Sequence, residues 1–92
     1  MIHHFDQRCQ ERGISSIPGK TLRQNIERAI AEGRDDLVEL VFHIDTACSA
    51  WRFRVAEGVF YAICGRYSKR CITLYNREIM RGVRNARRFR SK

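Results

Sequence analysis

The chain has 92 residues, of which 43% are hydrophobic and 30% are charged, and its formal net charge is +8. This length and hydrophobic content suit one domain with a single modest core and argue against two folded domains. No run of 18 uncharged apolar residues is present, and the N-terminal "MIHHFDQRCQERG" carries charges where a signal peptide needs an apolar segment, so we expect a soluble, cytosolic protein.

Two helices are predicted within residues 1–33. In "HFDQRCQERGI", Phe5 and Cys9 have helical spacing, and the glycine of "ERGI" is placed to end the helix. A turn at "SSIPGK" leads into "TLRQNIERAIAEG", where apolar residues recur at helical spacing from Leu22 to Ile30. Gly33 ends this second predicted helix.

Residues 37–76 change to β-branched and aromatic side chains and predict a four-stranded antiparallel meander. The strand segments are "LVELVFHID", "SAWRFRVA", "VFYAICGR" and "RCITLYN", and the turns between them are too short for crossover helices. A two-residue turn at Glu57-Gly58 predicts that Val55 faces Phe60 on the core side of the sheet.

The opposite side of this predicted sheet mixes arginines with tyrosines. That combination suits a nucleic acid, because a guanidinium binds the backbone and an aromatic ring stacks on a base. The residues expected on this outer side are Arg52, Arg54, Tyr61, Ile63, Thr73 and Tyr75.

Residues 77–88 return to a helical pattern, and residues 89–92 are expected to fray. In "REIMRGVRNARR", Ile79, Met80, Val83 and Ala86 fall on one side, which we expect to dock on the domain. The predicted order is ααββββα, a single α+β domain with two N-terminal helices, an antiparallel sheet and a basic C-terminal helix.

The positive charge is concentrated at the C-terminal end. Residues 1–65 contain eight Lys/Arg and nine Asp/Glu, a net −1, whereas residues 66–92 contain ten Lys/Arg and only Glu78, a net +9. Within the last helix, Arg77, Arg81, Arg84 and Arg88 are spaced to form one row. The row is either a solvated helix face or a surface for phosphates or an acidic partner, for which the planar arginine fork is well suited.

No metal, cofactor or catalytic residue is predicted. The four cysteines form no C-x-x-C pair and are expected to be reduced thiols, and the three histidines have no accompanying ligands at metal-binding spacing. An RNA-cleaving enzyme is kept as an alternative, because Glu57, His43, Tyr61 and Tyr75 are of the types that such chemistry uses together with arginines. Nothing in the sequence fixes these groups around one point.

Two resemblances bear on function. "HFDQRCQERGI", followed by a helix and a four-stranded meander, resembles small toxin-like families whose fold is similar to bacterial messenger-RNA interferases. Such interferases rely on late Arg, Lys and Tyr residues, and the matching positions here are Arg66, Tyr75, Arg81 and Arg84. In length, basic end and layout, the whole chain also resembles phage-encoded anti-CRISPR proteins that inhibit type I-F surveillance complexes.

The second resemblance implies a non-enzymatic inhibitor, acting in the bacterial host cell, that binds Cas proteins and guide RNA and blocks hybridisation of target DNA. Neither a membrane nor a small-molecule substrate is expected. A net charge of +8 is incompatible with mimicry of DNA and favours negative surfaces, either RNA phosphates or protein carboxylates. The alternatives are an RNA-cleaving toxin and a general nucleic-acid-binding protein. The predicted contact residues are Arg77, Arg81, Arg84 and Arg88, a second set of Arg52, Arg54, Arg66, Lys69 and Arg70, and Tyr61 and Tyr75 for stacking.

Overall fold

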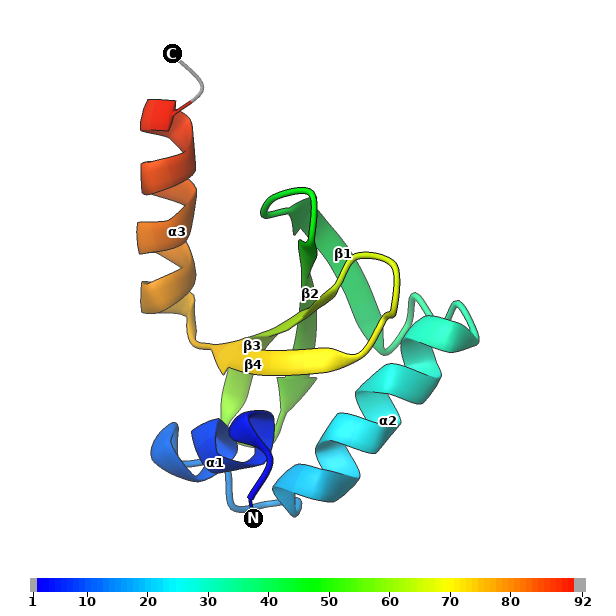
Figure 1. The fold of residues 1–92 in the computed structure, drawn as a ribbon. Coiled ribbons are helices and arrows are strands. Elements are labelled where there is room, and N and C mark those ends of the chain that lie inside the picture. The colour runs from blue at the N-terminus through cyan, green and yellow to red at the C-terminus, as the bar shows by residue number, and fades with distance from the viewer. Residues whose placement is uncertain (1, 91–92) are drawn as a thin grey trace.

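The computed structural model describes the backbone of residues 2–90 and the side chains of residues 2–84. It confirms an α+β fold with a four-stranded antiparallel sheet (Figure 1). The elements are α1 (His4–Glu11), α2 (Gly19–Ala31), β1 (Val38–His43), β2 (Cys48–Val55), β3 (Gly58–Gly65), β4 (Cys71–Tyr75) and α3 (Arg77–Arg90). Helix α3 extends two residues beyond the predicted end at residue 88.

The sheet is the predicted meander, with strand order β1-β2-β3-β4, but its central turn differs from the prediction. Val55 pairs with Gly58, and Phe53 rather than Val55 faces Phe60. The turn therefore comprises Ala56 and Glu57, and Gly58 opens β3 with φ of +132°, a conformation that favours glycine. Because the register shifts by two residues, each side chain stays on its predicted face of the sheet.

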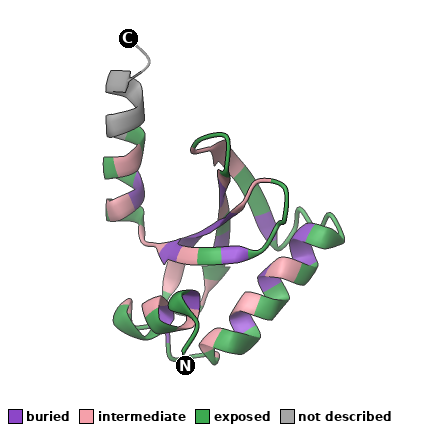
Figure 2. Ribbon diagram, viewed as in Figure 1, coloured by how far each residue is buried: buried purple, intermediate pink, exposed green. Residues whose placement is uncertain are grey.

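Helices α1 and α2 lie on one face of the sheet and enclose the main core (Figures 1 and 2). Phe5 of α1 is fully buried, and Leu22 and Ile26 of α2 are buried in the same cluster. On the strands this cluster includes Phe53, Phe60, Ala62 and Leu74. The apolar faces of α1 and α2, which follow helical spacing, therefore pack against the core-facing side chains of the strands, which alternate along β2.

Helix α3 covers part of the opposite face. Met80 is 2% exposed and packs in a second cluster with Ala50, Tyr61 and Ile63, while Val83 is partly buried against it. Of the four residues expected to dock, Met80 and Val83 pack in this cluster, and Ile79 is half-buried but does not belong to it. The side chain of Ala86 lies outside the described residues. The sheet is sandwiched between two helices on one side and one on the other.

Candidate functional site

Three arginines of α3, Arg77, Arg81 and Arg84, lie along one exposed flank of a helix whose orientation is fixed. Asn76 begins the helix, since its Oδ1 accepts a hydrogen bond from the Ile79 N–H at 2.8 Å. With Met80 turned to the sheet, helical geometry places Arg77, Arg81 and Arg84 within an arc of about 60° beside it. All three are exposed. Arg88 continues the row in sequence, but its side chain lies outside the described residues.

Arg84 also fastens the row to the sheet. Its guanidinium carbon lies 5.4 Å from the ring centroid of Phe42 on β1, within the range of a cation–π contact. Tyr75, the last residue of β4, pairs with Tyr61, whereas Phe42 lies further along the sheet beside Ala50. Helix α3 therefore runs along the outer face toward the end of the sheet that carries the β1–β2 loop.

Acidic side chains neutralise other arginines of the chain. Within residues 2–84, the ion pairs are Arg8–Glu11, Arg23–Asp6, Arg34–Asp36 and Arg52–Glu39. None of these pairs includes Arg77, Arg81 or Arg84, so the flank of α3 keeps its full charge among the described side chains. Arg52, by contrast, forms an ion pair with Glu39, which lies opposite it on β1.

Three further predicted cations, Arg66, Lys69 and Arg70, gather on the β3–β4 hairpin. Their loop meets the β1–β2 loop, because the Arg66 N–H donates to the Ala47 carbonyl at 2.7 Å. The hairpin and Arg84 therefore belong to the same end of the sheet. Arg54 lies toward the other end, opposite Val59. The structure thus separates Arg54 from the hairpin cations and pairs Arg52 with Glu39, while α3 and the β3–β4 hairpin lie apart from each other (Figure 1).

The two tyrosines predicted to stack on bases are not exposed side chains. Tyr61 is only 6% exposed because α3 covers it, and Tyr75 is half-buried. The expectation of an open outer face that presents both rings is therefore wrong for Tyr61. Tyr67, which the sequence reasoning missed, stands 81% exposed in the hairpin between Arg66 and Lys69. Its position in "GRYSKR", a turn rich in cations, is the signal that could have identified it.

The groups considered for RNA cleavage lie at opposite ends of β2. His43 Nδ1 lies 2.7 Å from Ser49 Oγ, next to the start of the strand. Glu57, beyond its end, accepts hydrogen bonds from the Ser15 and Ser16 N–H groups at 2.9 and 2.8 Å and from Ser16 Oγ at 2.6 Å. These contacts, that of the Ser16 hydroxyl first, lower the pKa of Glu57 to about 2. Six strand residues separate the two sites by roughly 20 Å, so His43 and Glu57 do not share a reaction centre.

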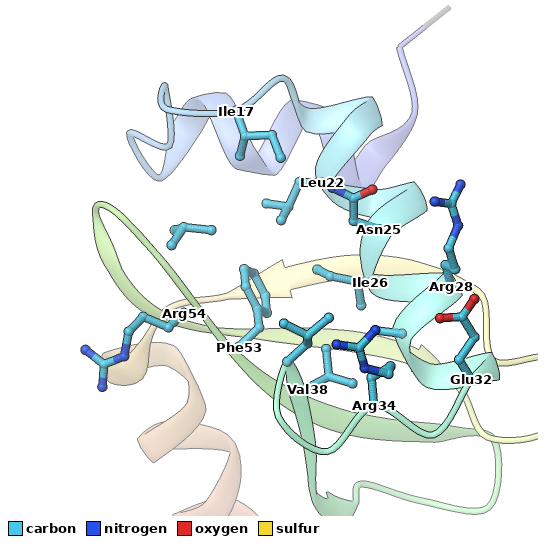
Figure 3. A pocket seen from close by; sticks show the side chains of 13 residues that line it. Ile17, Leu22, Asn25, Ile26, Arg28, Glu32, Arg34, Val38, Phe53 and Arg54 are labelled. Carbon is cyan, nitrogen blue, oxygen red and sulfur yellow. The ribbon is translucent and has the colours of Figure 1, made fainter.

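A groove between α2 and the β1–β2 edge was not foreseen from the sequence (Figure 3). Its volume is about 540 Å³, and apolar side chains that include Leu22, Ile26 and Phe53 form its floor. Arg28 and Arg54 stand at its rim. The groove depends on the angle and distance at which α2 packs against the sheet. Helical periodicity predicts the buried face of α2 but not this packing geometry.

The remaining site classes find no support in the part of the chain that the structure describes. Among these residues no three His, Cys, Asp or Glu side chains come together as a metal site. None of the described helices has the length and apolarity needed to cross a bilayer. Comparison of the chain with protein-family models, curated proteins and solved structures finds no match.

Proposed function

We propose that this is a non-enzymatic binding protein that holds a negatively charged partner against the arginine flank of α3. The observation that carries the proposal is the exposed row of Arg77, Arg81 and Arg84, free of ion pairs among the described side chains while four other arginines have acidic partners. Neighbouring like charges on a helix repel one another by a few tenths of a kcal/mol per pair. A partner that supplies negative charge relieves this repulsion.

For the partner we propose the Cas protein and guide-RNA assembly of a type I-F surveillance complex. The overall resemblance to anti-CRISPR proteins supports this choice, and so does the sign of the charge, because guide-RNA phosphates are negatively charged groups of such an assembly. An inhibitor bound along these phosphates prevents the guide from pairing with target DNA. The roughly 20 Å between His43 and Glu57 favours binding over RNA cleavage.

The test combines binding and cleavage assays with the same purified protein. We expect it to co-elute with a type I-F complex, abolish binding of target DNA and leave free RNA intact. Cleavage of free RNA would support the interferase-like toxin instead, and binding to any RNA without effect on the complex would support a general nucleic-acid-binding protein. Either result contradicts the proposal.

The arginine row is tested by the triple variant Arg81→Glu, Arg84→Glu and Arg88→Glu. A matched control, Lys20→Glu, Arg28→Glu and Arg54→Glu, changes the net charge equally at three exposed positions away from α3. We expect the first variant to lose complex binding and the second to retain most of it. Both should fold, since substitutions at exposed positions such as Arg81 or Lys20 typically change the free energy of unfolding by less than about 0.5 kcal/mol. Loss of the cation–π contact between Arg84 and Phe42 adds about 0.5–1 kcal/mol in the first variant. Equal loss in both would show that total charge matters and the row does not.

A further inference from the structure

The β3–β4 hairpin has a loop whose backbone is tightly held. The Lys69 N–H donates to the Gly65 carbonyl at 3.0 Å, and the Gly65 N–H donates to the Arg70 carbonyl at the same distance. Ser68 Oγ accepts a hydrogen bond from the Arg70 N–H at 3.3 Å. A Cβ atom at Gly65 would lie only 2.3 Å from Ser68 Oγ, so a larger residue there would displace the Ser68 hydroxyl from its present position. These bonds fix the conformation of the loop before any partner arrives.

A second set of contacts fixes the loop relative to the domain. The Arg66 N–H donates to Ala47, and Ala47 is itself held because its N–H donates to Asp45 Oδ1 at 2.8 Å. The same Asp45 oxygen accepts from the Cys48 N–H at 2.8 Å. The tip of the hairpin therefore rests on a structured neighbouring loop.

This fixed loop presents one aromatic ring among three cations. Tyr67 is 81% exposed, and the guanidinium carbon of Arg66 lies 5.8 Å from its ring centroid. Lys69 and Arg70 are exposed, and no ion pair reaches any of the three cations among the side chains that the structure describes. An exposed ring gains nothing from the protein core, whereas it offers a flat apolar face to a ligand.

We propose that this hairpin tip binds single-stranded nucleic acid, with an unpaired base stacked on Tyr67 and the flanking phosphates on Arg66, Lys69 and Arg70. Aromatic rings with adjacent cations provide the two contacts that a single strand needs, a π-face for the base and positive charge for the backbone. An acidic peptide uses the cations but not the ring, and the bases of a duplex are already stacked on one another. The fixed loop lowers the entropic cost of binding.

The inference extends the proposed function, because it adds that the partner contains unpaired nucleotides and that these bind the hairpin. The observations that support it come from the hairpin alone. Fluorescence anisotropy with a labelled ten-nucleotide oligouridine tests it, alongside a GC-rich RNA duplex of equal length, which stays paired under the conditions of the assay, and inorganic polyphosphate. Tyr67→Ala should weaken binding of the single strand by about fivefold to 150-fold, and Tyr67→Phe should retain the affinity. Leu37→Ala, which removes an apolar side chain that is likewise exposed, is the matched control and should have no effect.

The cations make a separate prediction for the same oligouridine. Replacing Arg66, Lys69 and Arg70 with Gln should reduce the slope of log affinity against log salt by about 2, since each phosphate contact on a single strand contributes about 0.7. The duplex and polyphosphate should lose affinity with these three substitutions but not with Tyr67→Ala.

The inference is overturned if oligouridine does not bind, if Tyr67→Ala binds it like the unmodified protein, or if that variant loses equal affinity for all three probes. Its failure is distinguishable from failure of the proposed function. Oligouridine binding that depends on Tyr67, without binding to the surveillance complex, overturns the proposed function alone. Inhibition of the complex with no role for Tyr67 on oligouridine overturns this inference alone.

Discussion

Substitution of Met80 by Ala should weaken the docking of α3 on the sheet while leaving the charge of the arginine row unchanged. Met80 is 2% exposed and is the most deeply buried described side chain of α3, where it packs on Ala50, Tyr61 and Ile63. Truncation of a buried Met, Leu or Ile to Ala costs about 2–5 kcal/mol. Because the second cluster is small and open at its edge, we expect the low end, about 2 kcal/mol, which lowers the equilibrium constant for docking about thirtyfold.

The loss of stability should be confined to α3. A helix of 14 residues is marginal on its own, so α3 depends on its contacts with the sheet. The main core lies on the other face and does not include Met80. Hydrogen exchange measured by mass spectrometry should therefore accelerate in peptides from residues 77–84 and stay unchanged in α1 and α2. Met80→Leu, a swap of similar volume, should cost less than about 1.5 kcal/mol and serves as the control.

Binding to the surveillance complex completes the experiment. If an ordered row is required, Met80→Ala should weaken binding although every arginine is still present. Unchanged exchange in residues 77–84, or acceleration throughout the domain, would refute the reasoning that α3 docks as a local unit. Unchanged binding by a protein with an undocked α3 would show that the order of the row is irrelevant.

Other contacts give further expectations. Ser16 and Ser15 lower the pKa of Glu57 from 4.5 to about 2, so stabilisation by its carboxylate is complete above the ordinary pKa and disappears as the pH falls toward 2. Glu57→Gln should accordingly lower the urea midpoint at pH 7 but not at pH 2, and an equal loss at both would contradict this assignment. Asp6→Asn should remove about 1.5 kcal/mol of unfolding free energy in urea titrations, because Asp6 accepts two charge-assisted hydrogen bonds from Arg23 that are partly shielded from water. Thiol labelling of the folded protein should modify only Cys48, the one half-buried cysteine of the four, and labelling of a second native thiol would show that the core opens.

Local patterns in the sequence predicted most of the fold. The helical spacing of Leu22 and Ile26 and the alternation around Phe53 each specify a buried face, so the elements and their core sides follow from short segments. The register of β2 and β3 was off by two residues because the turn position depends on Gly58, whose φ of +132° suits the first residue of β3. A shift by two keeps each face, which is why the error did not disturb the predicted core.

The candidate site was harder to predict because it depends on how elements pack. The placement of α3 over the outer face buries Tyr61, and no spacing within the helix reveals which face of a sheet it will cover. One signal was available: β3 contains Phe60, Tyr61, Ala62, Ile63 and Cys64, a continuous apolar run, and all five are buried. Such a run indicates burial on both faces of a strand. Tyr67 lies in a turn, where periodicity gives no information.

The local pairing of acids with arginines has a consequence for the kinetics of association. Asp6, Glu11, Asp36 and Glu39 pair with cations on α1, α2 and β2 and in the loop before β1. Residues 66–92 carry a net +9 and residues 1–65 a net −1, so we expect the molecule to have an electric dipole moment. A negatively charged partner orients such a dipole during diffusion, before the surfaces touch. The association rate constant should therefore fall steeply as salt shortens the Debye length below about 8 Å, while the dissociation rate constant changes much less.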